Sequence, residues 1–122
     1  MAVMTDATIF HILPKCLWHE LRGTEEYRGD TLDTEGFIHC STELQVIPTA
    51  NRFFVGRDEH VVLRIDPKRV IAPVIYEDTS GGGVEFPHIY GPLNLSAVEG
   101  IHELLIGAGG LFERLSEYER ID

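Results

Sequence analysis

Three histidines stand next to short runs of β-forming residues, and we expect side-chain chemistry there. His11 lies in ATIFHIL, His39 ends GFIHC, and His88 lies in EFPHIYGPL. Imidazole titrates close to neutral pH, so it can donate or accept a proton in general acid–base catalysis. The three histidines are therefore the catalytic candidates, expected to share one pocket. The structural alternative for each is a half-buried ring bonded to a backbone carbonyl.

A serine and a threonine follow the histidine and cysteine of GFIHCST without a break. The T-x-x-Q spacing is typical of a capping box, so a helix is predicted to begin at Thr42 and to run to about Phe54. Free N–H groups at a helix N-terminus bind anions. Ser41 and Thr42 are therefore predicted to contact a phosphate, helped by Arg52 further along the helix. The alternative is that Thr42 serves only as the N-cap.

The segment EFPHIYGPL carries a second group of polar and aromatic residues. Its two prolines stiffen the chain and Gly91 turns it, while His88 and Tyr90 are expected to project from one face. A stiff extended segment with these side chains makes a suitable pocket wall. Tyr90 and Gly91 are therefore assigned to substrate binding. An ordinary turn or β-bulge is the competing interpretation.

Other reactive side chains carry weaker signals. The two cysteines do not form a disulfide framework, which favours a reduced, cytoplasmic protein. Cys40 is expected to face the same side as Ile38 and to be buried and inert. Three carboxylates lie beside β-rich segments: Glu77, Glu85 and Glu99. The remaining histidines are expected at the surface or at sheet edges: His19, His60 and His102.

The charge distribution limits the class of partner. The net charge is −10, with three basic and eight acidic residues up to position 51, five and three in 52–69, and two and nine from 70 onward. Such a chain repels nucleic acid over most of its surface. The basic central segment favours a small phosphorylated ligand. No apolar stretch approaches the ~20 residues of a membrane span, so no membrane partner is expected.

The elements that position these residues are short. Strands are predicted at 7–13, 36–40, 60–66 and 72–78, with helices at 14–23 and 42–54, the latter kinked or restarted at Pro48. The segment 97–105 fits a strand or a helix, and its mid-run Gly100 and β-forming Val98 and Ile101 favour the strand. GAGG (107–110) is a predicted turn, followed by a short final element. Residues 1–122 are expected to form a single α+β domain with a small, antiparallel-rich sheet.

The motif order identifies a resemblance over about residues 8 to 105. IFHIL, GFIHCSTELQV, ANRFF, a strand ending in RID, and EFPHIYGPL follow one another as in a family of small bacterial proteins known only as a domain of unknown function. That family resembles the ADP-ribosyltransferase superfamily in fold. The resemblance implies a split β-sheet with short helices, and NAD bound in a cleft between two small sheets.

The resemblance also implies roles for particular residues. His11 matches the superfamily's first-strand His or Arg, and the second-strand His and Ser/Thr positions match His39, Ser41 and Thr42. Many transferases end with a catalytic Glu on a late strand, which no motif matches here; Glu85 and Glu99 are the nearest candidates.

The expected function is binding, and processing, of NAD or a related ADP-ribosyl compound. The expected pocket is lined by His11, His39, Ser41, Thr42, His88 and Tyr90. One alternative is a non-catalytic binding module with the same pocket. Another is a metal-dependent hydrolase that holds zinc on the three histidines. The chain has no H-x-H pair, so no metal is expected.

Overall fold

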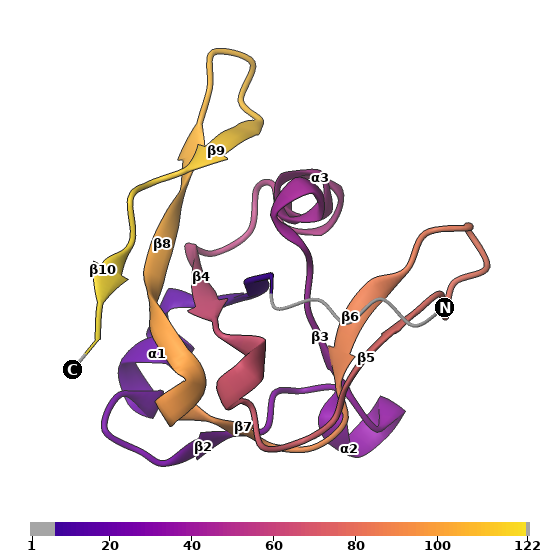
Figure 1. Cartoon of the computed structure of the whole chain (residues 1–122). Coiled ribbons are helices and arrows are strands. Elements are labelled where there is room, and N and C mark those ends of the chain that lie inside the picture. Colours follow the sequence, from indigo (N-terminus) through magenta and orange to yellow (C-terminus); the bar gives the residue numbers. More distant parts are fainter. Residues whose placement is uncertain (1–6, 122) are drawn as a thin grey trace.

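The main sheet of the computed structural model, which describes residues 7–121, has five antiparallel strands (Figure 1). Their order is β1 (Ile9–Pro14), β4 (His60–Ile65), β8 (Val98–Ile106) and β10 (Glu119–Arg120), with β9 (Phe112–Leu115) also paired to β8. The strand predicted at 97–105 is thus confirmed. The predicted turn at 107–110 joins β8 to β9.

A separate small sheet carries the second and third histidine motifs. It has the order β3 (Ile38–His39), β6 (Phe86–Ile89) and β5 (Val74–Glu77), again antiparallel. A further two-stranded pairing joins β2 (Glu26–Tyr27) to β7 (Leu93–Asn94). In Figure 1 the small sheet lies to the right of the main sheet. The antiparallel arrangement of more than one sheet agrees with the predicted α+β class.

Two backbone hydrogen bonds join the main sheet to the small one. The N–H of Phe10 donates to the carbonyl of Ser41 at 2.8 Å, and the N–H of Ser41 donates to the carbonyl of Phe10 at 2.7 Å. Because Ser41 lies two residues beyond β3, this bridge fixes where β3 meets β1. It also fixes the start of the helix that follows.

Helices lie on the outside of the sheets. They are α1 (Lys15–Leu21), α2 (Leu32–Glu35) and α3 (Glu43–Phe53), and single 3₁₀ turns occur at η1 (Pro67–Arg69) and η2 (Leu95–Ala97). The helix α3 runs through Pro48 without the predicted restart. Pro48 cannot donate to the carbonyl four residues earlier, but that carbonyl belongs to the exposed residue Leu44, where water can replace the missing donor.

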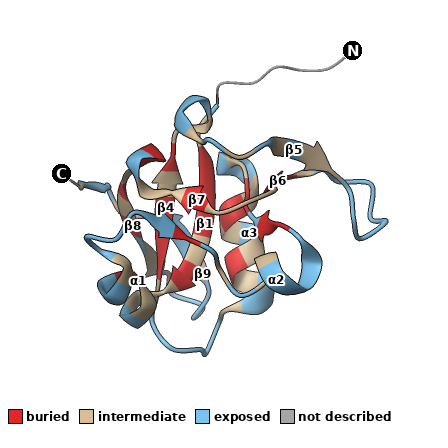
Figure 2. Ribbon diagram, turned by 90° about the horizontal axis from the view of Figure 1, so that it is seen from below, coloured by how far each residue is buried: buried red, intermediate tan, exposed pale blue. Residues whose placement is uncertain are grey.

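Alternating residues of the central strands form two apolar clusters (Figure 2). Ile9 and Leu13 of β1 join the larger cluster, and Phe10 packs with Val46 of α3 in the smaller one. This alternation confirms the predicted strand period of two. The larger cluster also contains Val61, Leu63, Ile65, Trp18, Ile38 and Ile89.

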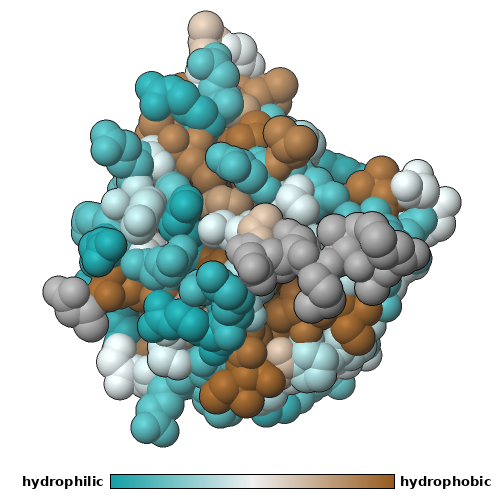
Figure 3. All heavy atoms as spheres, in the orientation of Figure 1, coloured by the Kyte–Doolittle hydropathy of each residue, from teal (hydrophilic) through white to brown (hydrophobic). Residues whose placement is uncertain are grey.

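The hydrophilic character of the surface agrees with the acidic composition of the chain. On the face seen in Figure 3, hydrophilic residues predominate and hydrophobic ones occur in separate groups. Exposed apolar residues include Ile106 and Leu111 of the β8–β9 hairpin. Isolated apolar side chains of this kind are normal on a folded protein.

Replacing Gly100 by alanine is expected to lower the free energy of unfolding by about 1–3 kcal/mol, because an added methyl group overpacks the site. Gly100 lies in β8 opposite Arg120 of β10. A Cβ atom there would lie 2.6 Å from Cδ2 of Tyr118 and closer still to the backbone oxygen of Glu119. Urea denaturation of Gly100→Ala measures the effect.

The matched control is Gly109→Ala, because a Cβ atom at Gly109 would meet nothing within 4 Å. It should change the free energy of unfolding by less than about 0.5 kcal/mol. Equal stability of the two variants would show that β10 does not pack on Gly100.

Candidate functional site

The pairing of β3 with β6 places two histidines side by side. His39 is directly opposite His88 in the antiparallel register, so both side chains project from the same face of the small sheet. Their ring centroids lie 5.3 Å apart. The sheet therefore brings together two of the three predicted catalytic candidates, from positions 49 residues apart in the sequence.

Two more rings complete this group. Phe37 stacks on His88 with centroids 4.1 Å apart and planes at 17°, and its centroid lies 4.8 Å from that of His39. The ring of Tyr90 lies 5.3 Å from Phe37. We call Phe37, His39, His88 and Tyr90 the ring cluster. Its exposed member is His39, whose side chain is 48% accessible, whereas His88 is 2% exposed.

A single carboxylate holds two members of the ring cluster. Oε2 of Glu77, on β5, accepts hydrogen bonds from the hydroxyl of Tyr90 and from Nδ1 of His88, the latter at 2.8 Å. These bonds, that of Tyr90 first, lower the pKa of Glu77, and the carboxylate raises the pKa of Tyr90. With Nδ1 donating, the neutral His88 ring presents Nε2 as an acceptor.

His39 has a carboxylate partner of its own. Its Nε2 lies 3.2 Å from Oε1 of Glu35, at the end of α2. Two imidazole–carboxylate pairs therefore stand on neighbouring strands. A carboxylate that orients an imidazole and stabilises its cation is a common arrangement for proton transfer.

His11 occupies a different environment. Its Nδ1 donates to the carbonyl of His39 at 2.6 Å, and its Nε2 accepts from the hydroxyl of Tyr27 at 2.8 Å. Burial lowers the pKa of His11 to about 4 and raises the pKa of Tyr27. Both ring nitrogens are occupied, so His11 joins β1 to β3 and has no free nitrogen for catalysis. This corrects its assignment as a catalytic candidate and as a pocket-lining residue.

The residues that begin α3 have structural roles. Ser41 is buried, and its backbone forms the bridge to Phe10. The N–H of Thr42 donates to Oε1 of Gln45 at 3.0 Å, which is one half of the predicted capping box. Nε2 of Gln45 donates in turn to the carbonyl of Glu85 at 2.7 Å, which ties the start of α3 to the segment before β6.

Arg52 lies far from the start of α3. It is in the last turn, ten residues beyond Thr42, which corresponds to about 15 Å along a helix. Its side chain is exposed, with the guanidinium 5.1 Å from the centroid of the Phe53 ring. The predicted help of Arg52 in phosphate binding at the start of α3 stays a prediction, with the two residues at opposite ends of the helix.

The backbone conformation and close packing at Gly91 explain why this residue is glycine. Its φ is +154°, and a Cβ atom there would lie 2.8 Å from Cβ of Ala72. It follows Tyr90, whose N–H donates to the carbonyl of Pro73 at 2.8 Å. The predicted turn is confirmed, and the close approach to Ala72 explains the residue without a ligand.

Sequence reasoning did not assign Phe37 or Glu77 to this site. The i, i+2 relation of Phe37 to His39 predicts a shared face. Glu77 had no motif, and only the pairing of β5 with β6 selects it. Glu85 is tied to Gln45 through its carbonyl, and Glu99 lies 3.4 Å from Nε of Arg64.

His102 was expected near the surface but is buried. It lies on β8 opposite Val62, and its Nδ1 donates to the carbonyl of Ser116 at 2.7 Å. Burial lowers the pKa of His102. The prediction failed because β9 and Tyr118 cover this end of β8, which β-propensity does not reveal. Cys40 is buried as predicted, and burial raises its pKa, which keeps the thiol protonated.

Within residues 7–121, no group of three His, Cys, Asp or Glu side chains is arranged to hold a metal ion. His11 cannot join His39 and His88 as a zinc ligand, because its nitrogens bond to protein groups. The same part of the chain has no helix long and apolar enough to cross a membrane.

Comparison with known proteins identifies a family and its solved structures. The model of a family described as "Protein of unknown function (DUF952)" matches residues 12–101. Protein CC0527 from Caulobacter crescentus, in its crystal structure, is 29% identical, with a TM-score of 0.75 over 88% of this chain and 94% of that one. Its solution NMR structure gives a TM-score of 0.68 over 87% and 91% of the two chains. No curated protein matches.

Proposed function

This chain belongs to the DUF952 family, and we propose that it binds NAD or a related ADP-ribosyl compound at the ring cluster. The observation that carries the proposal is the register of β3 and β6, which places His39 opposite His88 within a group of four rings. Phe37 and His88 form a buried base, and His39 offers an accessible ring on which a nicotinamide or adenine base can stack.

The phosphate groups of such a ligand have a place close by. The helix α3 begins four residues after His39, and the positive end of its dipole favours an anion there. The ring cluster and the start of α3 together suit a ligand that combines a pyrophosphate with a flat base.

Catalysis also needs a group that accepts a proton beside the bound ligand. The Glu77–His88 pair has the arrangement of a general base, with Nε2 of His88 as the atom that receives a proton. His88 is almost entirely buried beneath Phe37, and this observation favours the second candidate function, a binding module without turnover. Incubation with NAD, followed by chromatography for nicotinamide and ADP-ribose, distinguishes the two.

Binding of NAD is expected to raise the melting temperature, and His39→Ala to remove most of that increase. At a ligand concentration of ten times Kd, binding to the folded state alone adds about 1.4 kcal/mol to the free energy of unfolding. For a domain of this size that corresponds to about 4 °C. The measurement is a thermal-shift series with NAD, ADP-ribose, AMP, adenosine and inorganic phosphate.

The matched control is His19→Ala, because His19 is an exposed histidine on α1 that is absent from the ring cluster. This variant should keep the full NAD shift. The proposal is wrong if millimolar NAD and ADP-ribose leave the melting temperature unchanged, or if the two histidine variants respond alike.

A further inference from the structure

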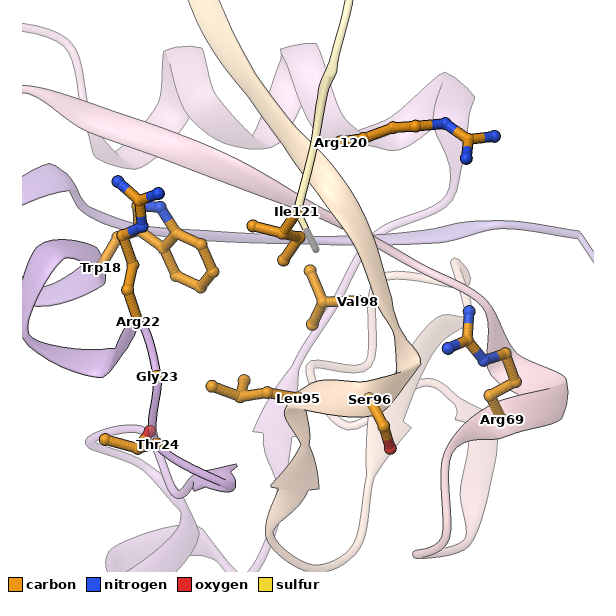
Figure 4. Close-up of a pocket in the computed structure, with 10 residues that line it drawn as sticks. All are labelled: Trp18, Arg22, Gly23, Thr24, Arg69, Leu95, Ser96, Val98, Arg120 and Ile121. Carbon is orange, nitrogen blue, oxygen red and sulfur yellow. The ribbon is translucent and has the colours of Figure 1, made fainter.

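A hollow of about 580 Å³ lies on the side of α1 and β10 (Figure 4). In Figure 1 these two elements are on the left, and the small sheet that carries the ring cluster is on the right. None of the residues that line it belongs to the ring cluster, so the hollow is separate from the proposed NAD site. Four apolar residues contribute to its lining, and we call them its floor: Leu95 and Ile121, which are partly exposed, and Trp18 and Val98, which are almost fully buried. These residues come from α1, η2, β8 and the segment after β10.

Three arginines border this hollow, and we call it the arginine hollow. Figure 4 shows Arg22 beside Trp18 on one side, and the guanidinium groups of Arg69 and Arg120 on the other side, with the apolar floor between them. The arginines belong to the end of α1, to η1 and to β10. Chain segments distant in sequence thus converge to place positive charge around one apolar surface.

The charge of the lining is opposite to that of the chain. The protein has twenty acidic and ten basic residues, yet among residues 7–121 three of the basic residues line the arginine hollow and no acidic residue does. A concave surface lined by one sign of charge concentrates counter-ions of the other sign. The arginine hollow is therefore an attractive region for an anion on an otherwise acidic molecule.

The three guanidinium groups have no internal partner within residues 7–121. Ion pairs there join Lys15, Arg28 and Arg64 to carboxylates, and none includes Arg22, Arg69 or Arg120. The nearby carboxylate of Glu99, which borders a smaller adjoining hollow of about 180 Å³, is paired with Arg64. Within the described part of the chain, no carboxylate is therefore paired with the three guanidinium groups of the arginine hollow.

We propose that the arginine hollow binds a small organic anion with an apolar body, whose phosphate ester or carboxylate lies between Arg69 and Arg120. The apolar floor contacts the body of the ligand, and the planar guanidinium groups form charge-assisted hydrogen bonds with its oxygens. This site is separate from the proposed NAD site and does not depend on it.

The single tryptophan of the chain reports on this hollow, because Trp18 is part of the floor. Phenyl phosphate is the probe, titrated against Trp18 fluorescence. We expect saturable binding of phenyl phosphate. Phenol and inorganic phosphate should each bind at least tenfold more weakly, because phenol lacks the anionic group and inorganic phosphate lacks the apolar body. A parallel titration with benzoate shows which anionic group binds more tightly, and added salt should weaken binding.

Substitution distinguishes this site from non-specific binding. Arg69→Gln and Arg120→Gln are each expected to raise the Kd for phenyl phosphate by about fivefold or more, because each removes a charge-assisted hydrogen bond. Arg57→Gln removes an exposed arginine outside the hollow and should leave Kd unchanged. His39→Ala in the ring cluster should also leave it unchanged, so failure of the NAD proposal would not affect this result.

The proposal is overturned by any of three results. These are no saturable fluorescence change at millimolar phenyl phosphate, equal affinity for phenol and phenyl phosphate, or equal loss of affinity in Arg57→Gln and Arg69→Gln. Far-ultraviolet circular dichroism of each variant establishes that it is folded, and the salt dependence of the wild-type protein tests the anion requirement without any substitution.

Discussion

Acidification from pH 6.5 to pH 4 is expected to lower the free energy of unfolding by about 3 kcal/mol through His11 alone. Burial lowers the pKa of His11 to about 4 in the folded chain, below its ordinary value of 6.5. Between these two values the unfolded chain binds more protons than the folded one. The stabilisation is therefore complete above pH 6.5 and is lost as the pH falls toward 4.

The structural reason is burial, which deprives a charged imidazole of water, and it outweighs the hydrogen bond to the carbonyl of His39, which by itself raises the pKa of His11. A proton on Nε2 of His11 would displace the hydrogen bond from Tyr27 and leave a buried charge beside the main sheet. Burial lowers the pKa of His102 as well, so its contribution has the same sign. The two histidines make the protein sensitive to mild acid.

Urea denaturation between pH 7.5 and pH 5 measures this effect before most carboxylates titrate. His11→Gln replaces the ring by a side chain that can donate and accept hydrogen bonds but does not titrate, so its stability should depend less on pH. The slope with pH is compared, because the substitution also changes stability at neutral pH. His19→Gln, at an exposed position, should keep the wild-type slope. Identical slopes for wild type and His11→Gln would contradict the assignment.

Truncation of Ile38 is expected to lower the free energy of unfolding by about 3 kcal/mol, within the 2–5 kcal/mol typical of buried large-to-alanine changes. Ile38 is 0% exposed, lies opposite Ile89 in the register, and packs in the larger core cluster directly behind the ring cluster. Because β3 contains only Ile38 and His39, the packing of Ile38 also holds His39 in place.

The measurement is chemical denaturation of Ile38→Ala, together with its NAD shift. The control is Ile71→Ala, where the isoleucine is 84% exposed and the expected change is below about 0.5 kcal/mol. We expect Ile38→Ala to lose part of the NAD response as His39 becomes mobile. A cost below 1 kcal/mol would show that the interior behind the ring cluster repacks around the cavity.

The local pattern of the chain was sufficient to predict the longer strands and helices. The alternation of Ile9, Phe10 and Leu13 predicted β1 and its two faces, and the T-x-x-Q spacing predicted where α3 begins. These signals are local because strand period and helix capping depend on residues within about four positions of one another. The burial of Cys40 was likewise predicted from alternation, because Cys40 and Ile38 face the same side.

The candidate site could not be predicted from local sequence, because it forms where distant strands pair. Nothing near His39 in the sequence shows that it will lie opposite His88, or that Glu77 will hold both His88 and Tyr90. The sequence suggested His11 as a catalytic residue, but Tyr27 and the carbonyl of His39 occupy both of its nitrogens.

The sequence alone therefore determined the longer strands and helices and their apolar faces, because those properties arise from neighbouring residues, whereas the short elements β2, α2 and β10 were not predicted. Only the tertiary structure decided which histidines retain a free nitrogen, which carboxylate orients them, and that Arg22, Arg69 and Arg120 surround one hollow. Strand register and the packing of distant segments determine those contacts. Both depend on the whole chain, and a one-residue change in register would place the same side chains on the opposite face.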